Sequence, residues 1–244
     1  MLVLLCLLVA IVTSACGGVL RKKYEYEEEM YLFLDGTATV NVNASVASLV
    51  ALRGADLPVD PEARVDRRRV RAFFEGPSAS VAAVSLSRRN GRRYVHVSIN
   101  VADVRQLPHL TPFRWSAYRL EREGDLVVYK QTIGKPEGRP VGDIGWNGRE
   151  AVVFKMHLPS QIPYHNAPSK RVERGNILEW EQPLAERLRG VPIDVDVRME
   201  PESILYTTLL LFGSMIVAAA LVFALVIWWV WWRGREPEAL SHST

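Results

Sequence analysis

ILYTTLLLFGSMIVAAALVFALVIWWVWW, residues 204–232, carries no charged side chain along its whole length. A helix of this length rises about 43 Å, whereas a bilayer core of about 30 Å needs only about 20 apolar residues. Four tryptophans close the stretch and Tyr206 stands near its start, as amphipathic rings do at the two headgroup levels. The sequence therefore predicts one transmembrane helix over residues 204–232.

The charges that flank this stretch predict its orientation. Arg233 and Arg235 follow it directly, whereas Glu200 and Glu202 precede it. Because positive charge is retained in the cytoplasm, residues 233–244 are expected to form a cytoplasmic tail. Residues 24–203 are then expected to form one outer domain on the other side of the membrane.

A second apolar run, residues 1–12, leads into TSACG at residues 13–17. About eleven apolar residues suit a signal peptide and are too few for a membrane span. Small residues before Cys16, with glycine after it, resemble a bacterial lipobox. This resemblance implies that residues 1–15 are removed, that Cys16 carries a lipid and that residues 16–23 form a lipidated linker. Thr13 departs from the usual aliphatic residue, and the usual basic start is missing.

Two alternatives for this end remain open. Residues 2–20 can instead be an uncleaved membrane helix, with the main domain still outside. Arg21-Lys22-Lys23 can also hold the domain in the cytoplasm, although this inverted topology conflicts with the arginines after residue 232. The lipobox interpretation predicts a single-pass protein of the bacterial cytoplasmic (inner) membrane, with its main domain extracytoplasmic and its C-terminus cytoplasmic.

Alternating apolar and polar residues dominate residues 24–203 and predict β-strands. Turn signals at Asp35-Gly36, Asn90-Gly91 and Gly124 divide them into three hairpins. Further strands are expected over residues 151–158, 177–180 and 191–199, short helices over 46–53 and 61–75, and a long loop over 134–149. The predicted fold class is α+β: a largely antiparallel sheet with two or three short helices, followed by the transmembrane helix.

Positive charge is concentrated in one part of the domain. The chain has a net charge of only +3, yet nine arginines stand against two acids between Arg64 and Arg93. Such a patch predicts contact with anionic headgroups or an acidic partner. The candidate residues are Arg64, Arg67, Arg68 and Arg71 on the expected helix, and Arg88, Arg89, Arg92 and Arg93 at the second hairpin. The alternative is that these arginines only keep a helix and a turn solvated.

Residues that could carry chemistry form no recognised pattern. The five histidines have no metal-ligand spacing, and nucleophile and phosphate-loop motifs are missing. Glu25, Glu27 and Glu29 share one side of the first strand and are interpreted as a solvated face. We therefore expect no catalytic residue, no metal and no cofactor, and a protein that is not an enzyme. Nucleic acid is not an expected partner outside the cytoplasm.

Small side chains recur along the transmembrane stretch. Gly213, Ala220 and Ala224 share one face of the helix, with Ser214 and Ala218 beside them. Because small residues let helix backbones approach closely in hydrocarbon, this face predicts association with itself or with another membrane protein. The alternative is a plain anchor.

Short motifs near the end of the outer domain carry a family resemblance. They are MHLP (residues 156–159), HN (165–166), GNILEW (175–180) and Pro183. With the lipobox and the C-terminal span, they resemble the LppM-like bacterial cell-envelope lipoproteins. The resemblance implies an outer domain that binds membrane lipid or a lipidic glycoconjugate at the membrane surface, and it transfers no catalytic residue. An accessory subunit that docks on another membrane protein or complex is the alternative function.

Overall fold

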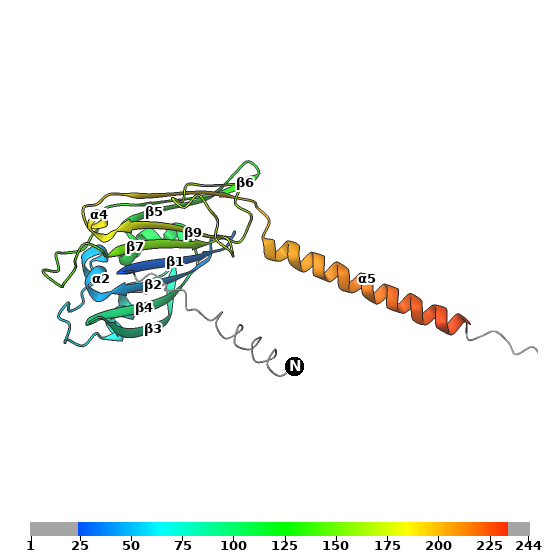
Figure 1. Cartoon of the computed structure of the whole chain (residues 1–244), viewed down its shortest axis with the longest axis horizontal. Helices are drawn as coiled ribbons and strands as arrows, with labels where there is room; N and C mark the ends of the chain where they lie inside the picture. The colour runs from blue at the N-terminus through cyan, green and yellow to red at the C-terminus, as the bar shows by residue number, and fades with distance from the viewer. Residues whose placement is uncertain (1–23, 234–244) are drawn as a thin grey trace, which may run out of the picture.

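The computed structural model describes residues 24–233, which form a two-sheet domain and one long helix (Figure 1). The predicted signal peptide, residues 16–23 with Cys16, and residues 234–244 lie outside the described residues. The first sheet has the order β3-β4-β2-β1-β7-β9 and the second β5-β6-β10-β8. The predicted α+β class is confirmed.

Nearly all neighbouring strands are antiparallel, as predicted, and β1 and β7 form a parallel pair. The strands of the first sheet are β1 (Tyr26–Leu32), β2 (Ala38–Ser45), β3 (Ala79–Arg89), β4 (Arg92–Val101), β7 (Ala151–His157) and β9 (Ile177–Pro183). Those of the second sheet are β5 (Ser116–Glu123), β6 (Leu126–Ile133), β8 (Tyr164–His165) and β10 (Ile193–Met199).

Local chemistry explains the elements that the sequence predicted well. Helix α2 (Val46–Arg53) begins where the Ser45 side chain accepts the Ser48 N–H, and it ends at Gly54 with a left-handed φ of 72°. Asn90 and Gly91 join β3 to β4 with positive φ values of 51° and 75°, as a tight hairpin turn requires.

The second short helix is shorter than predicted. Helix α3 spans Arg67–Phe74, because the Asp66 side chain accepts the Arg68 N–H and caps the helix there. Asp60, which precedes the predicted helix, accepts the Glu62 N–H within a separate turn. The expectation of a helix over residues 61–75 was therefore wrong for its first part, and Arg64 lies in the preceding loop.

Three further short elements complete the domain, and one of them confirms a helical turn that the sequence predicts near residues 103–107. Helix α4 spans Leu184–Leu188, and the 3-10 helices η1 and η2 span Val104–His109 and Thr111–Phe113. The alternation predicts a third hairpin from residue 113, but η2 occupies Thr111–Phe113 and the hairpin begins at Ser116. Residues 134–149 form the expected loop without regular structure.

One hydrophobic core fills the space between the sheets and contains residues of α2, α3 and α4. Tyr26 and Met30 of β1 face this interior together with Tyr129 of β6. Glu28 lies on the same interior side of β1 and forms a buried ion pair with Arg53 at the end of α2. The interior is largely apolar, but it also buries the side chains of Arg187, Gln131 and Gln182.

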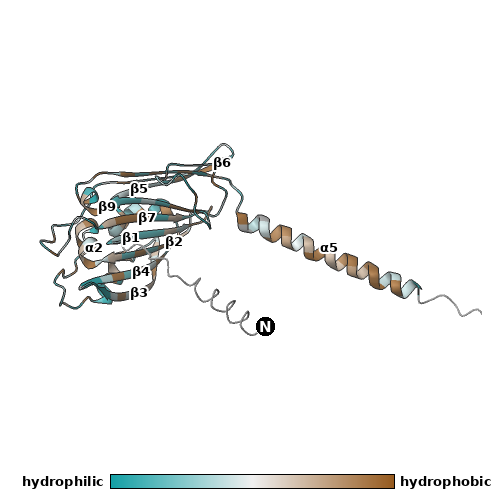
Figure 2. Cartoon of the chain, in the orientation of Figure 1, coloured by the Kyte–Doolittle hydropathy of each residue, from teal (hydrophilic) through white to brown (hydrophobic). Residues whose placement is uncertain are grey.

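Helix α5 (Ile204–Arg233) leaves the domain and makes no packing contact that buries it. Residues 208–233 have a mean hydropathy of 2.8 in their most apolar window, and Figure 2 shows apolar residues along the whole helix. Within the described residues it is the one helix that is long and apolar enough to cross a membrane.

The buried ion pair gives a stability prediction. Glu28→Leu leaves the Arg53 guanidinium charged in the interior, so it should lower the free energy of unfolding of residues 24–203 by about 3–5 kcal/mol in urea titrations. The double variant with Arg53→Met should recover most of this loss. Glu121→Gln, which breaks an exposed pair with Arg119, should leave the urea midpoint unchanged. A single variant as stable as the parent contradicts the assigned role.

Candidate functional site

The outer domain has two ends, defined by the direction of its strands (Figure 1). At the membrane-proximal end, the Ile204 N–H donates to the Pro159 carbonyl (3.0 Å), two residues beyond β7. The arginine end is the tip of the β3–β4 hairpin (residues 88–93) with the loop at residues 58–65. Strand β4 runs from Arg92 at the arginine end to Val101 near the β1–β2 turn, so about 30 Å of strand separates the two ends.

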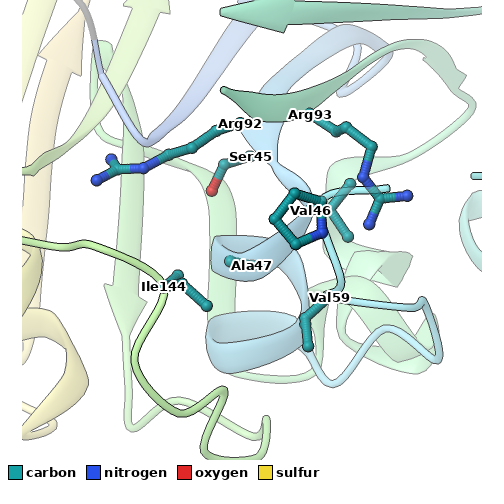
Figure 3. A pocket seen from close by; sticks show the side chains of 8 residues that line it. Ser45, Val46, Ala47, Val59, Arg92, Arg93 and Ile144 are labelled. Atoms are coloured by element: carbon teal, nitrogen blue, oxygen red, sulfur yellow. The ribbon is translucent and has the colours of Figure 1, made fainter. Parts of the chain in front are cut away.

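Three adjoining hollows surround the arginine end. The largest has a volume of about 430 Å³ and is lined by Glu62, Ala63, Arg64, Val65, Leu86, Ser87, Arg88, Arg93 and Tyr94. A second, of about 340 Å³, is lined by Glu25, Arg89, Asn90, Arg92, Tyr94, Asn147, Arg149 and Glu150. A third, of only about 30 Å³, lies against the start of α2. Figure 3 shows Arg92 and Arg93 extending to opposite sides of this small pocket.

The charge of Arg92 is neutralised inside the domain. Its guanidinium pairs with Glu25 and, at 3.3 Å, with Glu150. Burial alone would lower the pKa of Arg92, but the hydrogen bonds and charges of these two carboxylates raise it above the usual value. Arg92 therefore holds the hairpin onto the residue before β1 and the loop before β7, and it offers little charge to a ligand.

Arg93 keeps its positive charge without a contacting carboxylate. It donates to the carbonyl oxygens of Ala63 and Pro58. Burial, opposed in part by Asp60, lowers the pKa of Arg93. Arg88 donates to the Pro61 carbonyl at 2.7 Å and lies 3.5 Å from an exposed carboxylate of the same loop. The largest hollow thus has guanidinium groups that are only partly neutralised.

The candidate arginines separate into three groups in the structure. Arg64, Arg88 and Arg93 line the largest hollow, and Arg89 and Arg92 line the second. Arg67, Arg68 and Arg71 project from α3 and line none of the three. Arg71 donates to the Val81 carbonyl, whereas Arg67 and Arg68 make no ion pair among residues 24–233.

The acidic residues of β1 are not the solvated face that was predicted. Glu25 is 5% and Glu27 is 9% exposed. Glu27 accepts from Lys155 at 2.8 Å, and Glu29 contacts His157 at 2.7 Å. Bases on β4 and β7, which a single-strand pattern does not reveal, pair with these carboxylates and permit their burial.

A polar network on the same outer face escaped the sequence analysis. The Ser87 hydroxyl lies 2.7 Å from His96 Nε2, and Asn43 Oδ1 lies 2.9 Å from His96 Nδ1. Burial, and secondarily Arg89, lowers the pKa of His96. The three residues come from three strands, so no motif marks them. Because only Ser87 of the three lines a hollow, we assign the network a structural role in joining β2, β3 and β4.

The small residues of α5 have no partner within the domain. Side chains along Leu209–Arg233 are exposed, and a Cβ added at Gly213 would meet nothing within 4 Å. The face formed by Gly213, Ser214, Ala218, Ala220 and Ala224 is therefore open, and its association with another helix stays a prediction.

The fold and α5 together define a membrane-anchored α+β domain. No protein-family model and no curated protein matches the chain. Among solved structures, the chain is similar to the folded domain of the Mycobacterium tuberculosis LppM protein, determined by NMR, with a TM-score of 0.40 and 12% identity. The match covers 75% of this chain and 94% of that domain. Likeness at this level supports a loose LppM-like resemblance and carries no argument about ligand or site.

The open face of α5 gives a testable prediction. Gly213→Leu and Ala220→Leu add bulk to this face without adding charge, so they should abolish a cross-linking signal between copies of α5, or between α5 and a partner helix, in membranes. Val226→Leu adds bulk on the opposite face of the helix; it is the control and should leave the signal unchanged. A signal that survives both leucine substitutions identifies α5 as a plain anchor.

Proposed function

We propose that this chain is a membrane-anchored envelope protein whose non-catalytic outer domain binds the phosphate-bearing head of an anionic lipid or lipidic glycoconjugate. The single observation that carries the proposal is the largest hollow at the arginine end. It combines Arg64, Arg88 and Arg93 with the apolar side chains of Val65 and Leu86. A site that has both positive charge and apolar surface suits an amphiphilic ligand.

The chemistry of guanidinium groups supports a phosphate as the bound group. Planar guanidinium forks donate two parallel hydrogen bonds to phosphate oxygens. Arg93 is held in place by two carbonyl oxygens, so little of its freedom would be lost on binding. Tyr94 and Leu86 supply apolar contact beside these donors, where the first carbons of an acyl chain or a sugar face can pack.

The arginine groups allow a test matched in charge. Arg64→Ser, Arg88→Ser and Arg93→Ser together should weaken binding of residues 24–203 to phosphatidylglycerol liposomes by about 100-fold, at about 1 kcal/mol for each arginine. The control combines Arg67→Ser, Arg68→Ser and Arg71→Ser, which remove the same charge from α3. It should retain most of the binding in co-sedimentation at low salt, with both variants checked for an unchanged urea midpoint. Equal losses would identify a diffuse charged surface instead of a site.

The ligand itself is identified by what the full chain carries from its membrane. Mass spectrometry of the detergent-extracted protein should find a phosphate-containing lipid enriched over the bulk extract, and the Arg64/Arg88/Arg93 variant should lose it. A glycoconjugate and a simple phospholipid differ in mass, which separates the two sources. Enrichment of a membrane protein without lipid would favour the accessory-subunit function.

The proposed topology has the domain outside the bacterial inner membrane, the C-terminal tail in the cytoplasm and a lipid on Cys16. Cys16→Ala should leave a heavier precursor and remove labelling by a palmitate analogue. The variant should remain in the membrane fraction, because α5 anchors the chain more strongly than one acyl group. Labelling that survives the substitution contradicts the lipobox assignment.

A further inference from the structure

The membrane-proximal end has a hollow of its own, of about 340 Å³. Leu34, Leu120 and Val127 supply its apolar lining, and Pro201 closes it on the side of α5. It lies at the opposite end of the strands from the arginine end and shares no residue with the hollows there.

The chain itself places this hollow near the headgroups. Pro201 precedes the first residue of α5 by three positions, a span of at most about 10 Å. Two backbone hydrogen bonds hold the connection against the domain: Glu200 N–H to the Gln161 carbonyl and Ile204 N–H to the Pro159 carbonyl, both 3.0 Å. The domain surface around Pro201 is therefore fixed close to the bilayer that α5 crosses.

An exposed aromatic side chain projects at this end. Phe33 is 52% exposed, although it follows β1 directly and its neighbour Leu34 packs against the core. Backbone bonds across the β1–β2 turn, from Phe33 N–H to the Thr37 carbonyl (2.9 Å) and from Gly36 N–H to the Phe33 carbonyl (3.1 Å), hold it in place. A single exposed aromatic is ordinary on a soluble surface, but beside a membrane span it matches the aromatic residues of the interface.

The charges around this hollow are mixed. Arg122 donates to the Gly124 carbonyl at 3.2 Å and makes no ion pair among residues 24–233, so its charge is available. Arg105, by contrast, is paired with Asp103. Asp35 also lines the hollow, and its hydrogen bonds from Thr37 lower its pKa, which keeps it negative. Glu121 also lines the hollow, but it is paired with Arg119. Among residues 24–233, Arg122 and Asp35 are the lining charges that make no ion pair, and they suit a zwitterionic head with a phosphate and an ammonium group.

We propose that Phe33, Arg122 and the hollow beside Pro201 form a membrane-docking surface for the outer domain. Its occupant is the phospholipid headgroup layer of the bilayer that α5 crosses, with Phe33 at the level of the first acyl carbons and Arg122 on a lipid phosphate. The surface sets the orientation of the domain, with the arginine end directed away from the bilayer. It uses no residue of the arginine end and does not depend on a ligand there.

Photo-cross-linking of the full chain in nanodiscs of phosphatidylethanolamine and phosphatidylglycerol tests this orientation. Phe33→p-benzoylphenylalanine keeps an aromatic ring at an exposed position, and irradiation should give a lipid adduct by mass spectrometry. Asn90→p-benzoylphenylalanine at the hairpin tip should give none, and Tyr206→p-benzoylphenylalanine on α5 is the positive control. With the probe at residue 33, Arg122→Gln should lower the adduct yield severalfold, whereas Arg114→Gln, an exposed arginine that lies outside the hollow and pairs with Glu137, should not.

Each contrary result overturns the proposal. An adduct at residue 90 without one at residue 33 places the arginine end on the bilayer, and adducts at both positions show a domain that lies on its side. No adduct at either position, with the Tyr206 control positive, shows a domain held away from the membrane. Equal yields for the Arg122→Gln and Arg114→Gln proteins remove Arg122 from the surface.

Discussion

The buried pair of Arg53 and Glu28 is the contact on which the two-sheet arrangement depends. Arg53 reaches from the end of α2 to Glu28 and the Tyr26 hydroxyl on β1, and its guanidinium stacks on Trp115 at 3.8 Å from the ring centroid. Trp115 leads into the second sheet and lies 5.3 Å from the buried guanidinium of Arg187. Burial and the nearby Arg53 lower the pKa of Arg187 to about 10. Because leaving either charge unpaired is costly, the pair favours one packing of α2 against β1 and the segment that leads into the second sheet.

Sequence patterns predicted the elements whose signals are local. The alternation of β1 and β2, the Asn90-Gly91 turn and the helix over residues 46–53 each depend on neighbouring residues, and each is confirmed. The strand order and the parallel β1–β7 pair depend on contacts between residues more than a hundred positions apart, so no local pattern indicates them. Glu28 could not be singled out for the same reason. It is one of four glutamates between residues 25 and 29, and only its pairing with Arg53 shows that it faces the interior.

The sequence predicted the region of the candidate site, but it could not predict which of its arginines keep an unneutralised charge. Eight arginines were equivalent in the sequence, but their charges are not equivalent in the fold. Arg92 is neutralised by Glu25 and Glu150, whereas Arg93, the next residue, points to the other face of β4 and meets only carbonyl oxygens. Alternation along a strand assigns Arg92 and Arg93 to opposite faces of β4. The carboxylates and carbonyl oxygens that determine whether each charge is neutralised come from segments distant in the sequence.

The positions of the two ends constrain what the arginine end can bind. Its hollow lies about 30 Å along β4 from the end where α5 leaves, which is about the thickness of a bilayer core. The head of a simple phospholipid does not extend that far from its membrane, whereas the sugar and phosphate groups of a large glycoconjugate can. A lipid on Cys16 is compatible with an upright domain, because Tyr24 lies beside Arg89 at the arginine end and eight extended residues reach about 27 Å, nearly the distance between the two ends. The tilt of the domain on the bilayer therefore decides the class of ligand. The hollow of an upright domain can be reached only by an extended glycoconjugate, whereas that of a tilted domain can also be reached by a phospholipid.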